Sequence, residues 1–126
     1  MKTNVIESKA AIVLRWSARV VATLLFLLWG AFFVEHTIEW FIQPLPQTPP
    51  AGVWLGHAQH FLILAGLVML WRWEVIGSLV LIGSSLVFFV DKAGANFPLF
   101  FGVTAIPAIL LLVGRWLTRR IRPAAR

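Results

Sequence analysis

The chain has 126 residues, of which 60% are hydrophobic and 13% are charged, and its formal net charge is +6 at pH 7. So few polar residues cannot enclose this much apolar content in water, which excludes an ordinary soluble domain and indicates a protein of the lipid bilayer. The chain contains no cysteine, which excludes disulfides, thiolate metal sites and covalently attached c-type haem.

Four apolar segments have about the length that a membrane helix needs, which is roughly 20 residues for a hydrocarbon core of about 30 Å. The bulky and charged residues 32–36 follow the first segment where a signal-peptide cleavage site would need small ones, so we expect this segment to stay attached. The predicted fold class is all-α: a polytopic membrane protein with four transmembrane helices in an up-down bundle. We expect one membrane domain (1–126), with helices at about 12–41, 52–71, 74–90 and 97–118 and a basic tail at 119–126.

The cations are distributed unequally about these segments. If all four span the membrane, ten of the 11 Lys and Arg residues fall on one side and only Lys92 falls on the other. Cationic loops are retained in the cytoplasm, so we expect both termini there. The tryptophans agree, since six of the seven fall near the two predicted membrane boundaries and only Trp29 lies mid-span.

Several local signals refine this layout. Residues 43–50, "QPLPQTPP", predict an extended connector, and Thr48 is a candidate cap for the second helix. Pro107 lies mid-span and predicts a kink in the fourth helix. The segment before residue 12 either extends the first helix or lies along the membrane surface. Close helix contacts need small residues, and the candidates are Gly30, Ala31, Ala58, Ala65, Gly66, Gly77, Ser84, Ser85, Gly102, Ala105 and Ala108.

Acidic residues and histidines gather where the first helix ends and the second begins. The motif "VEHTIEWF" carries Glu35, His36 and Glu39, and "HAQH" carries His57 and His60. At about 100° per residue, Glu35 and Glu39 lie only about 40° apart around the first helix. Because consecutive helices run antiparallel, we expect all five side chains in one layer at the outer boundary of the membrane.

Three interpretations of this cluster stay open. The favoured one is a solvated or mutually hydrogen-bonded polar group, because the headgroup layer accommodates polar side chains at the lowest cost. The second is a transition-metal site formed by Glu35, His36, Glu39, His57 and His60, or a b-type haem held by His36 and one histidine of the second helix. The third is a proton-sensing or relay role, since histidine titrates near neutral pH.

No catalytic residues are predicted. The sequence shows no Ser/His/Asp grouping with plausible reach and no glycine-rich phosphate cradle. The arginines of the tail predict contact with anionic lipids, and the tail lacks the folded module or longer basic region that nucleic-acid binding would need.

Four segments of the chain resemble a known group of proteins: "RWSAR" (15–19), "WRWEVIGSLVLIG" (71–83), "FPLFF" (97–101) and "IPAILLLVGRWL" (106–117). They are similar to small bacterial integral membrane proteins that have four predicted helices and no assigned function. The resemblance implies the four-helix layout and a location in a bacterial inner membrane, and it offers no catalytic residue.

These observations favour a non-enzymatic accessory or structural membrane protein, acting with a membrane protein partner or as a homo-oligomer. The alternative is a metal- or haem-binding membrane protein with its site at the outer boundary. A small transporter or pH-responsive protein is the second alternative.

Overall fold

The computed structural model describes residues 2–43 and 48–121 of the chain. It has four long helices: α1 (Lys2–Thr37), α2 (Ala51–Met69), α3 (Glu74–Lys92) and α4 (Phe97–Ile121). Two short turns, the π turn η1 (Ile38–Ile42) and the 3₁₀ turn η2 (Gly94–Asn96), complete the described secondary structure. All four helices are long and apolar enough to cross a membrane, which confirms the predicted all-α class and four helices able to span a bilayer.

The ends of the helices differ from the prediction in two places. Helix α1 begins at Lys2, so the segment before residue 12 extends the first helix. The expected cap at Thr48 is wrong, because α2 is capped at Pro50 without a side-chain hydrogen bond and Val53 N donates to Pro50 O over 2.9 Å. Parts of the predicted connector (44–47) and of the basic tail (122–126) lie outside the described residues.

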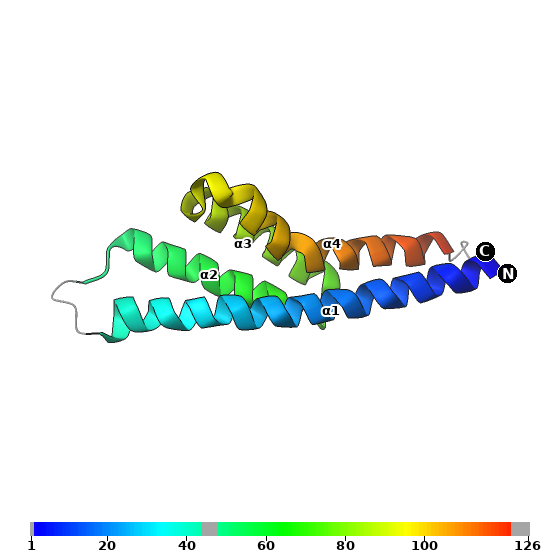
Figure 1. Ribbon diagram of the computed structural model, residues 1–126, viewed down its shortest axis with the longest axis horizontal. Helices are drawn as coiled ribbons and strands as arrows, with labels where there is room; N and C mark the ends of the chain where they lie inside the picture. Colours follow the sequence, from blue (N-terminus) through cyan, green and yellow to red (C-terminus); the bar gives the residue numbers. More distant parts are fainter. Residues whose placement is uncertain (1, 44–47, 122–126) are drawn as a thin grey trace.

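The helices follow one another around the bundle. Helix α1 packs against α2 and α4, and α3 packs against α2 and α4, so each helix contacts its neighbours in the chain. Figure 1 shows the helices running alternately in opposite directions. We call the end that contains the start of α1, the α2–α3 turn and the end of α4 the terminal end, and the opposite end the loop end.

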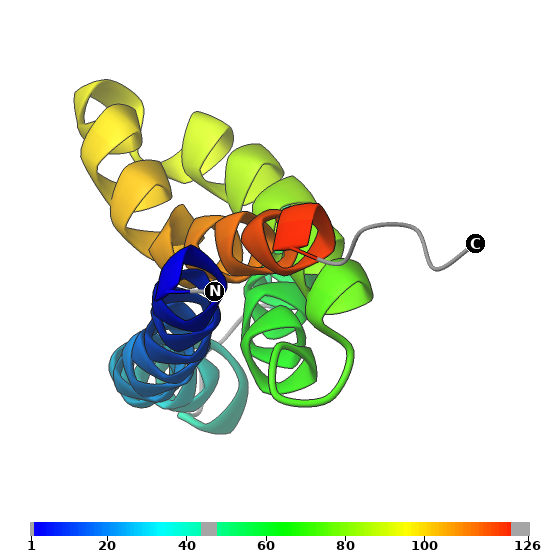
Figure 2. The same cartoon turned by 90° about the vertical axis from the view of Figure 1, so that its right-hand side faces the viewer.

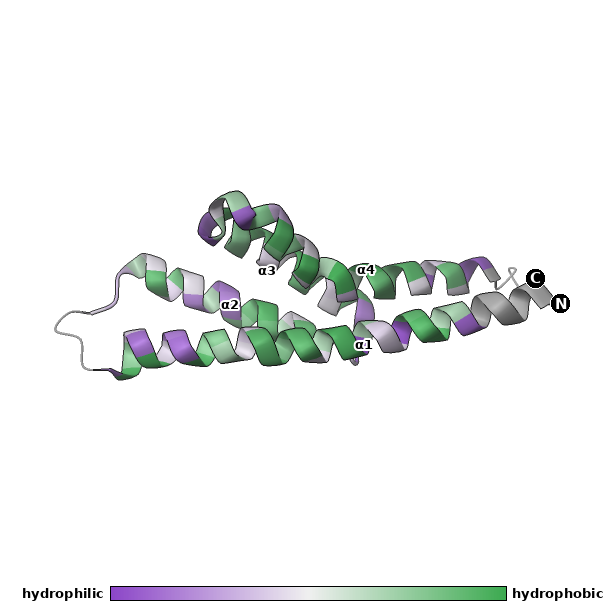
Figure 3. Cartoon of the chain, viewed as in Figure 1, coloured by the Kyte–Doolittle hydropathy of each residue, from purple (hydrophilic) through white to green (hydrophobic). Residues whose placement is uncertain are grey.

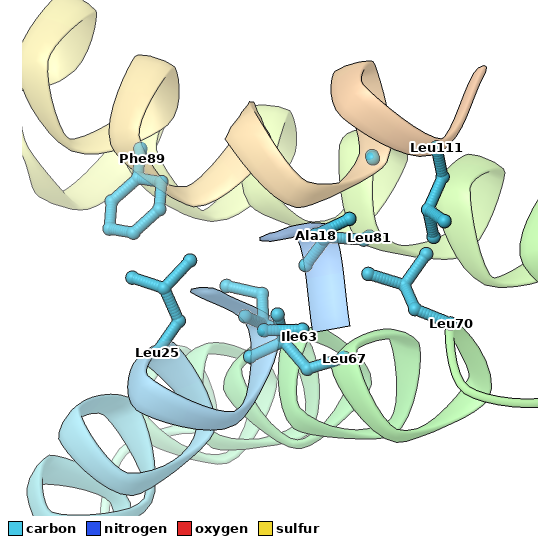
Figure 4. Packing of buried hydrophobic residues seen from close by; sticks show 10 residues of the cluster. Ala18, Leu25, Ile63, Leu67, Leu70, Leu81, Phe89 and Leu111 are labelled. Carbon is cyan, nitrogen blue, oxygen red and sulfur yellow. The ribbon is translucent and has the colours of Figure 1, made fainter. Parts of the chain in front are cut away.

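A core of aliphatic and small side chains joins the four helices. Ala18 and Leu25 of α1, Leu67 of α2, Leu81 of α3 and Leu111 of α4 are all buried. Figure 4 shows side chains of this core approaching one another from all four helices. Small residues let the helix backbones approach, which supplies the packing that lipid cannot.

Two glycines mark the closest approaches. A Cβ at Gly66 would lie 2.9 Å from Leu81 Cα, and a Cβ at Gly77 would lie 2.7 Å from Leu70 N, so α2 and α3 meet backbone to backbone. Gly30 and Gly102 were predicted in the same way, but a Cβ at either position would meet nothing within 4 Å. For these two the prediction of a close contact is wrong.

The bundle is splayed at the loop end. In Figure 1 and in the end-on view of Figure 2, α3 and the first part of α4 diverge from α1 and α2. Helix α4 descends toward α1 and then runs level beside it, and Pro107 lies within this helix. Figure 3 shows hydrophobic residues along most of α1, with polar residues near its loop end. Polar residues therefore occur on α1 where the bundle is splayed.

Candidate functional site

The five candidate residues come from α1, η1 and α2, and the structure divides them between two separate cavities. Glu35 and Glu39 line a groove of about 1030 Å³ together with residues such as Phe26, Val34 and Leu64. The three histidines line a different cleft. The physical reason is the helix geometry: His36 is about 100° from Glu35 around the axis, which is enough to place it on another side.

This division changes the metal hypothesis. Within residues 2–43 and 48–121, no three or more His, Cys, Asp or Glu side chains come close enough together to hold a metal ion. The expected convergence of Glu35, His36, Glu39, His57 and His60 into one ligand set is therefore not seen. Only the histidine part of the set shares one site.

We call the second site the histidine cleft. It has a volume of about 450 Å³ and lies between α1, α2 and α3. Its walls are largely aromatic and its polar groups are the three imidazoles and one ammonium. The lining residues are Trp29, Phe32, His36, Trp40, Gly52, Val53, Gly56, His57, His60, Phe88 and Lys92.

His60 is the deepest polar group of the cleft, with 6% of its surface exposed. Its Nε2 lies 2.9 Å from the backbone oxygen of Trp29. A carbonyl can only accept, so Nε2 carries the proton and donates it to α1. Trp29 in turn donates from its indole Nε1 to Thr104 Oγ1 of α4 over 3.1 Å. His60 and Trp29 therefore connect α2, α1 and α4 through polar contacts inside the bundle.

His57 lies about one turn before His60, nearer the start of α2. Its Nε2 lies 3.0 Å from Thr37 Oγ1, while Thr37 Oγ1 donates its own proton to Phe33 O over 2.7 Å. The hydroxyl has no second proton to give, so His57 Nε2 must be the donor. Its ring also stacks on Phe33, with the ring centres 4.1 Å apart. Both contacts hold the imidazole against α1.

The third histidine follows the same rule with its other nitrogen. His36 Nδ1 lies 2.8 Å from Phe32 O and therefore donates to it. A neutral histidine has one ring N–H, and each of the three donates it to an oxygen atom of α1. The remaining ring nitrogens, Nε2 of His36 and Nδ1 of His57 and His60, have no hydrogen-bond partner in the described part of the chain. The cleft is therefore lined by three imidazoles, each of which keeps one ring nitrogen without a partner among the described residues.

Lys92 contributes the only full positive charge among the residues that line the cleft. A Cβ at Gly56 would lie 3.2 Å from Lys92 Cε, so the lysine stem rests on α2 where a side chain is missing. Its Nζ pairs with Asp91 Oδ2 over 3.0 Å. This pair keeps the site close to electrically neutral.

Comparison with known protein families places the chain in a family and adds no activity. Residues 5–124 match the family described as "Domain of unknown function (DUF7670)". The chain belongs to that family. Searches of curated proteins and of solved structures gave no match.

Several residues of the site were not among the sequence candidates. Trp29 was predicted only as an isolated mid-span tryptophan, yet it lines the cleft, accepts from His60 and donates to Thr104. A signal was present in the sequence, because an indole N–H in the hydrocarbon region needs an acceptor. Phe88 and Lys92 had no comparable signal, since only the packing of α3 against α2 brings them to the cleft.

Proposed function

We propose that this chain is a non-enzymatic accessory membrane protein that holds a lipid-soluble ligand in the histidine cleft. The supporting observation is the chemistry of the cleft: three imidazole acceptors set among aromatic walls. Its volume of about 450 Å³ lies in the usual range for a small-molecule site of roughly 300 to 1,000 Å³. Sites of this kind are commonly found between the helices of bundles.

The acceptors indicate which ligands fit. Neutral histidines whose protons are already donated to α1 favour a ligand head that supplies hydrogen-bond donors. Trp29, Phe32 and Phe88 favour a flat aromatic head by stacking or edge contacts. A hydroxyl-bearing aromatic head on an apolar tail, such as a hydroquinone with an isoprenoid tail, meets both demands. The oxidised quinone meets only the second, because its carbonyls donate nothing.

The proposal includes the orientation predicted from the cations. With both termini in the cytoplasm of a bacterium, the histidine cleft lies at the outer boundary of the inner membrane. The ten cations predicted on one side support this orientation. A reporter enzyme fused after Arg126 should be active in the cytoplasm, and periplasmic activity would overturn the orientation without affecting the ligand assignment.

The test is equilibrium binding of the reduced and oxidised ligand to the protein in lipid nanodiscs. We expect the hydroquinone to bind more tightly than the quinone. His60→Phe retains a ring of similar shape but removes both the Nδ1 acceptor and the Nε2 donor to Trp29 O. Provided that the variant keeps the wild-type helix content by circular dichroism, it should weaken hydroquinone binding about tenfold, as expected for one hydrogen bond. Glu39, in η1, lines the separate groove, so Glu39→Gln should leave binding unchanged.

Three outcomes would decide against this proposal. Absence of binding, equal binding of both redox forms, or equal binding by the wild type and His60→Phe would each contradict it. Elemental analysis of protein prepared without a histidine tag tests the metal or haem alternative. Near-stoichiometric metal that disappears in His60→Phe would show that the cleft binds a metal or haem instead of a hydroquinone. Acidification tests the lone pairs directly: protonated imidazoles cannot accept, so hydroquinone binding should fall.

A further inference from the structure

A second polar site lies at the terminal end, far along the bundle from the histidine cleft. It is a hollow of about 430 Å³ where α1, the α2–α3 turn, the start of α3 and α4 meet. Three arginines from three of these elements face it. We call it the arginine pocket, lined by Arg15, Arg72, Trp73, Glu74, Val75, Ile76 and Arg115.

One carboxylate organises two of the arginines. Arg15 Nε lies 2.8 Å from Glu74 Oε1, and Arg115 Nη1 lies 3.9 Å from Glu74 Oε2. The Glu74 side chain is only 13% exposed, so it acts as a partly buried clamp between α1 and α4. Arg72 forms no ion pair in the described part of the chain. Three arginines against one glutamate leave two positive charges in excess.

The start of α3 adds hydrogen-bond donors to the same pocket. The N-cap residue Trp73 makes no side-chain capping bond, and Gly77 N is the first amide of the helix to reach a carbonyl, that of Trp73 over 2.7 Å. The amides of Glu74, Val75 and Ile76 therefore have no acceptor among the described residues. Free amides at a helix N-terminus attract anions, and here they lie beside arginines.

We propose that the arginine pocket binds the phosphodiester headgroup of an anionic phospholipid in the leaflet at the terminal end. Arginine and free amides are the donors that phosphate oxygens prefer, and the excess charge selects an anionic over a zwitterionic lipid. The neighbouring surface favours a lipid over free phosphate, because Trp73 and Ile76 are each 56% exposed apolar residues at the rim. A headgroup in the pocket would place its acyl chains along such a surface.

This site differs from the lipid contact predicted for the tail at 119–126. The tail would attract any anionic surface by its summed charge, at about 1 kcal/mol per residue. The pocket instead presents arginines from separate elements at fixed positions around a hollow. It therefore predicts a retained lipid with defined stoichiometry.

The experiment is native mass spectrometry of the full chain released from detergent with phosphatidylglycerol, phosphatidylcholine or inorganic phosphate. We expect one phosphatidylglycerol to be retained, about tenfold more than phosphatidylcholine, and no binding of inorganic phosphate at equal concentration. Arg72→Gln should reduce retention about tenfold. Arg119→Gln makes the same change of charge on the exposed end of α4 and should leave retention nearly unchanged.

The variants also separate binding from folding. Arg72 does not brace the helices, so Arg72→Gln should keep the wild-type helix content by circular dichroism, and Arg72→Lys should restore part of the retention. Equal retention of both lipids, or equal losses from Arg72→Gln and Arg119→Gln, would overturn the site. Binding of inorganic phosphate as tightly as phosphatidylglycerol would overturn the lipid assignment.

Discussion

The two ends of the bundle are built by different rules. Toward the terminal end, helices approach one another closely through small residues such as Ala18, Gly77 and Ala108, and the arginine pocket lies at their charged ends. Toward the loop end, large rings such as Trp29 and Phe88 stand between the helices, and the space they leave is the histidine cleft. The comparison teaches that residue size sets how closely the helices approach one another, and that the space left at the loop end is lined by rings whereas the space left at the terminal end is lined by charges.

Polar contacts complete the contrast. At the loop end they lie inside the bundle, where His60, Trp29 and Thr104 connect three helices. At the terminal end the charged contacts lie at the start of α3, where Glu74 pairs with arginines of α1 and α4. Hydrogen bonds across helices help to hold the splayed end together where close packing is missing.

The largest predicted effect is at the closest approach. Gly77→Ala places a Cβ 2.7 Å from Leu70 N and 2.8 Å from Met69 C, and backbone cannot move aside as a side chain can. We expect a loss of about 3 kcal/mol in the free energy of unfolding, at the upper end of overpacking costs. Denaturation in mixed micelles with increasing sodium dodecyl sulfate measures it.

Gly83→Ala is the matched control, because the same methyl group on the same helix would meet nothing within 4 Å. It should be neutral or stabilise by up to about 1 kcal/mol through helix propensity. Similar losses from the two substitutions would show that helix approach does not define the packed end.

A smaller effect on stability but a visible change of shape is expected from Pro107→Ala. A kink of about 20° or more at Pro107 would displace the preceding ten residues, which extend about 15 Å, by about 5 Å. Restoring the backbone hydrogen bond should let the first part of α4 move toward α1 and narrow the splay. The chain has no cysteine. Spin labels at Leu55→Cys of α2 and Leu99→Cys of α4, both exposed positions, can therefore report the distance between α2 and the first part of α4, which measures the splay.

We expect the label distance to shorten by about 5 Å in Pro107→Ala. Pro98→Ala is the control, since Pro98 lies in the first turn of α4, where proline fits a helix without kinking it. An unchanged distance in Pro107→Ala would assign the splay to the aromatic side chains instead.

Much of the fold could be predicted from the sequence because membrane helices obey a simple length rule. Four apolar segments predicted four spans, and the structure has four helices of that kind. Which residue contacts which neighbouring helix was harder to predict from the sequence. Gly66 and Gly30 look alike in sequence, but only Gly66 meets another backbone, because helix rotation and crossing decide which glycines face a neighbour.

For the candidate site, the sequence predicted only the level along the helices at which its residues lie. Helix lengths predicted Glu35, His36, Glu39, His57 and His60 at one level, and in the structure they lie in the last part of α1, in η1 and in the first half of α2. The prediction failed to separate the glutamates from the histidines, because it treated the end of a helix as one small surface although side chains 100° apart can face different neighbours. Tertiary packing also brings Phe88 and Lys92 of α3 into the lining of the histidine cleft, and no sequence pattern in α1 or α2 could predict this.

The smallest predicted effect concerns a serine in the packed region. Ser78 Oγ is fully buried and has no hydrogen-bond partner among residues 2–43 and 48–121, whereas Ser85 Oγ, on the same helix, donates to Leu81 O over 2.6 Å. An unpaired hydroxyl costs free energy, so Ser78→Ala should raise the stability by somewhat less than about 1 kcal/mol, and Ser85→Ala should lower it by a similar amount. The same micelle denaturation measures both changes. Changes of opposite sign in the free energy of unfolding would show that close packing governs this region even where it leaves a polar group without a partner. A loss of stability in both variants would mean that the Ser78 hydroxyl does form a hydrogen bond.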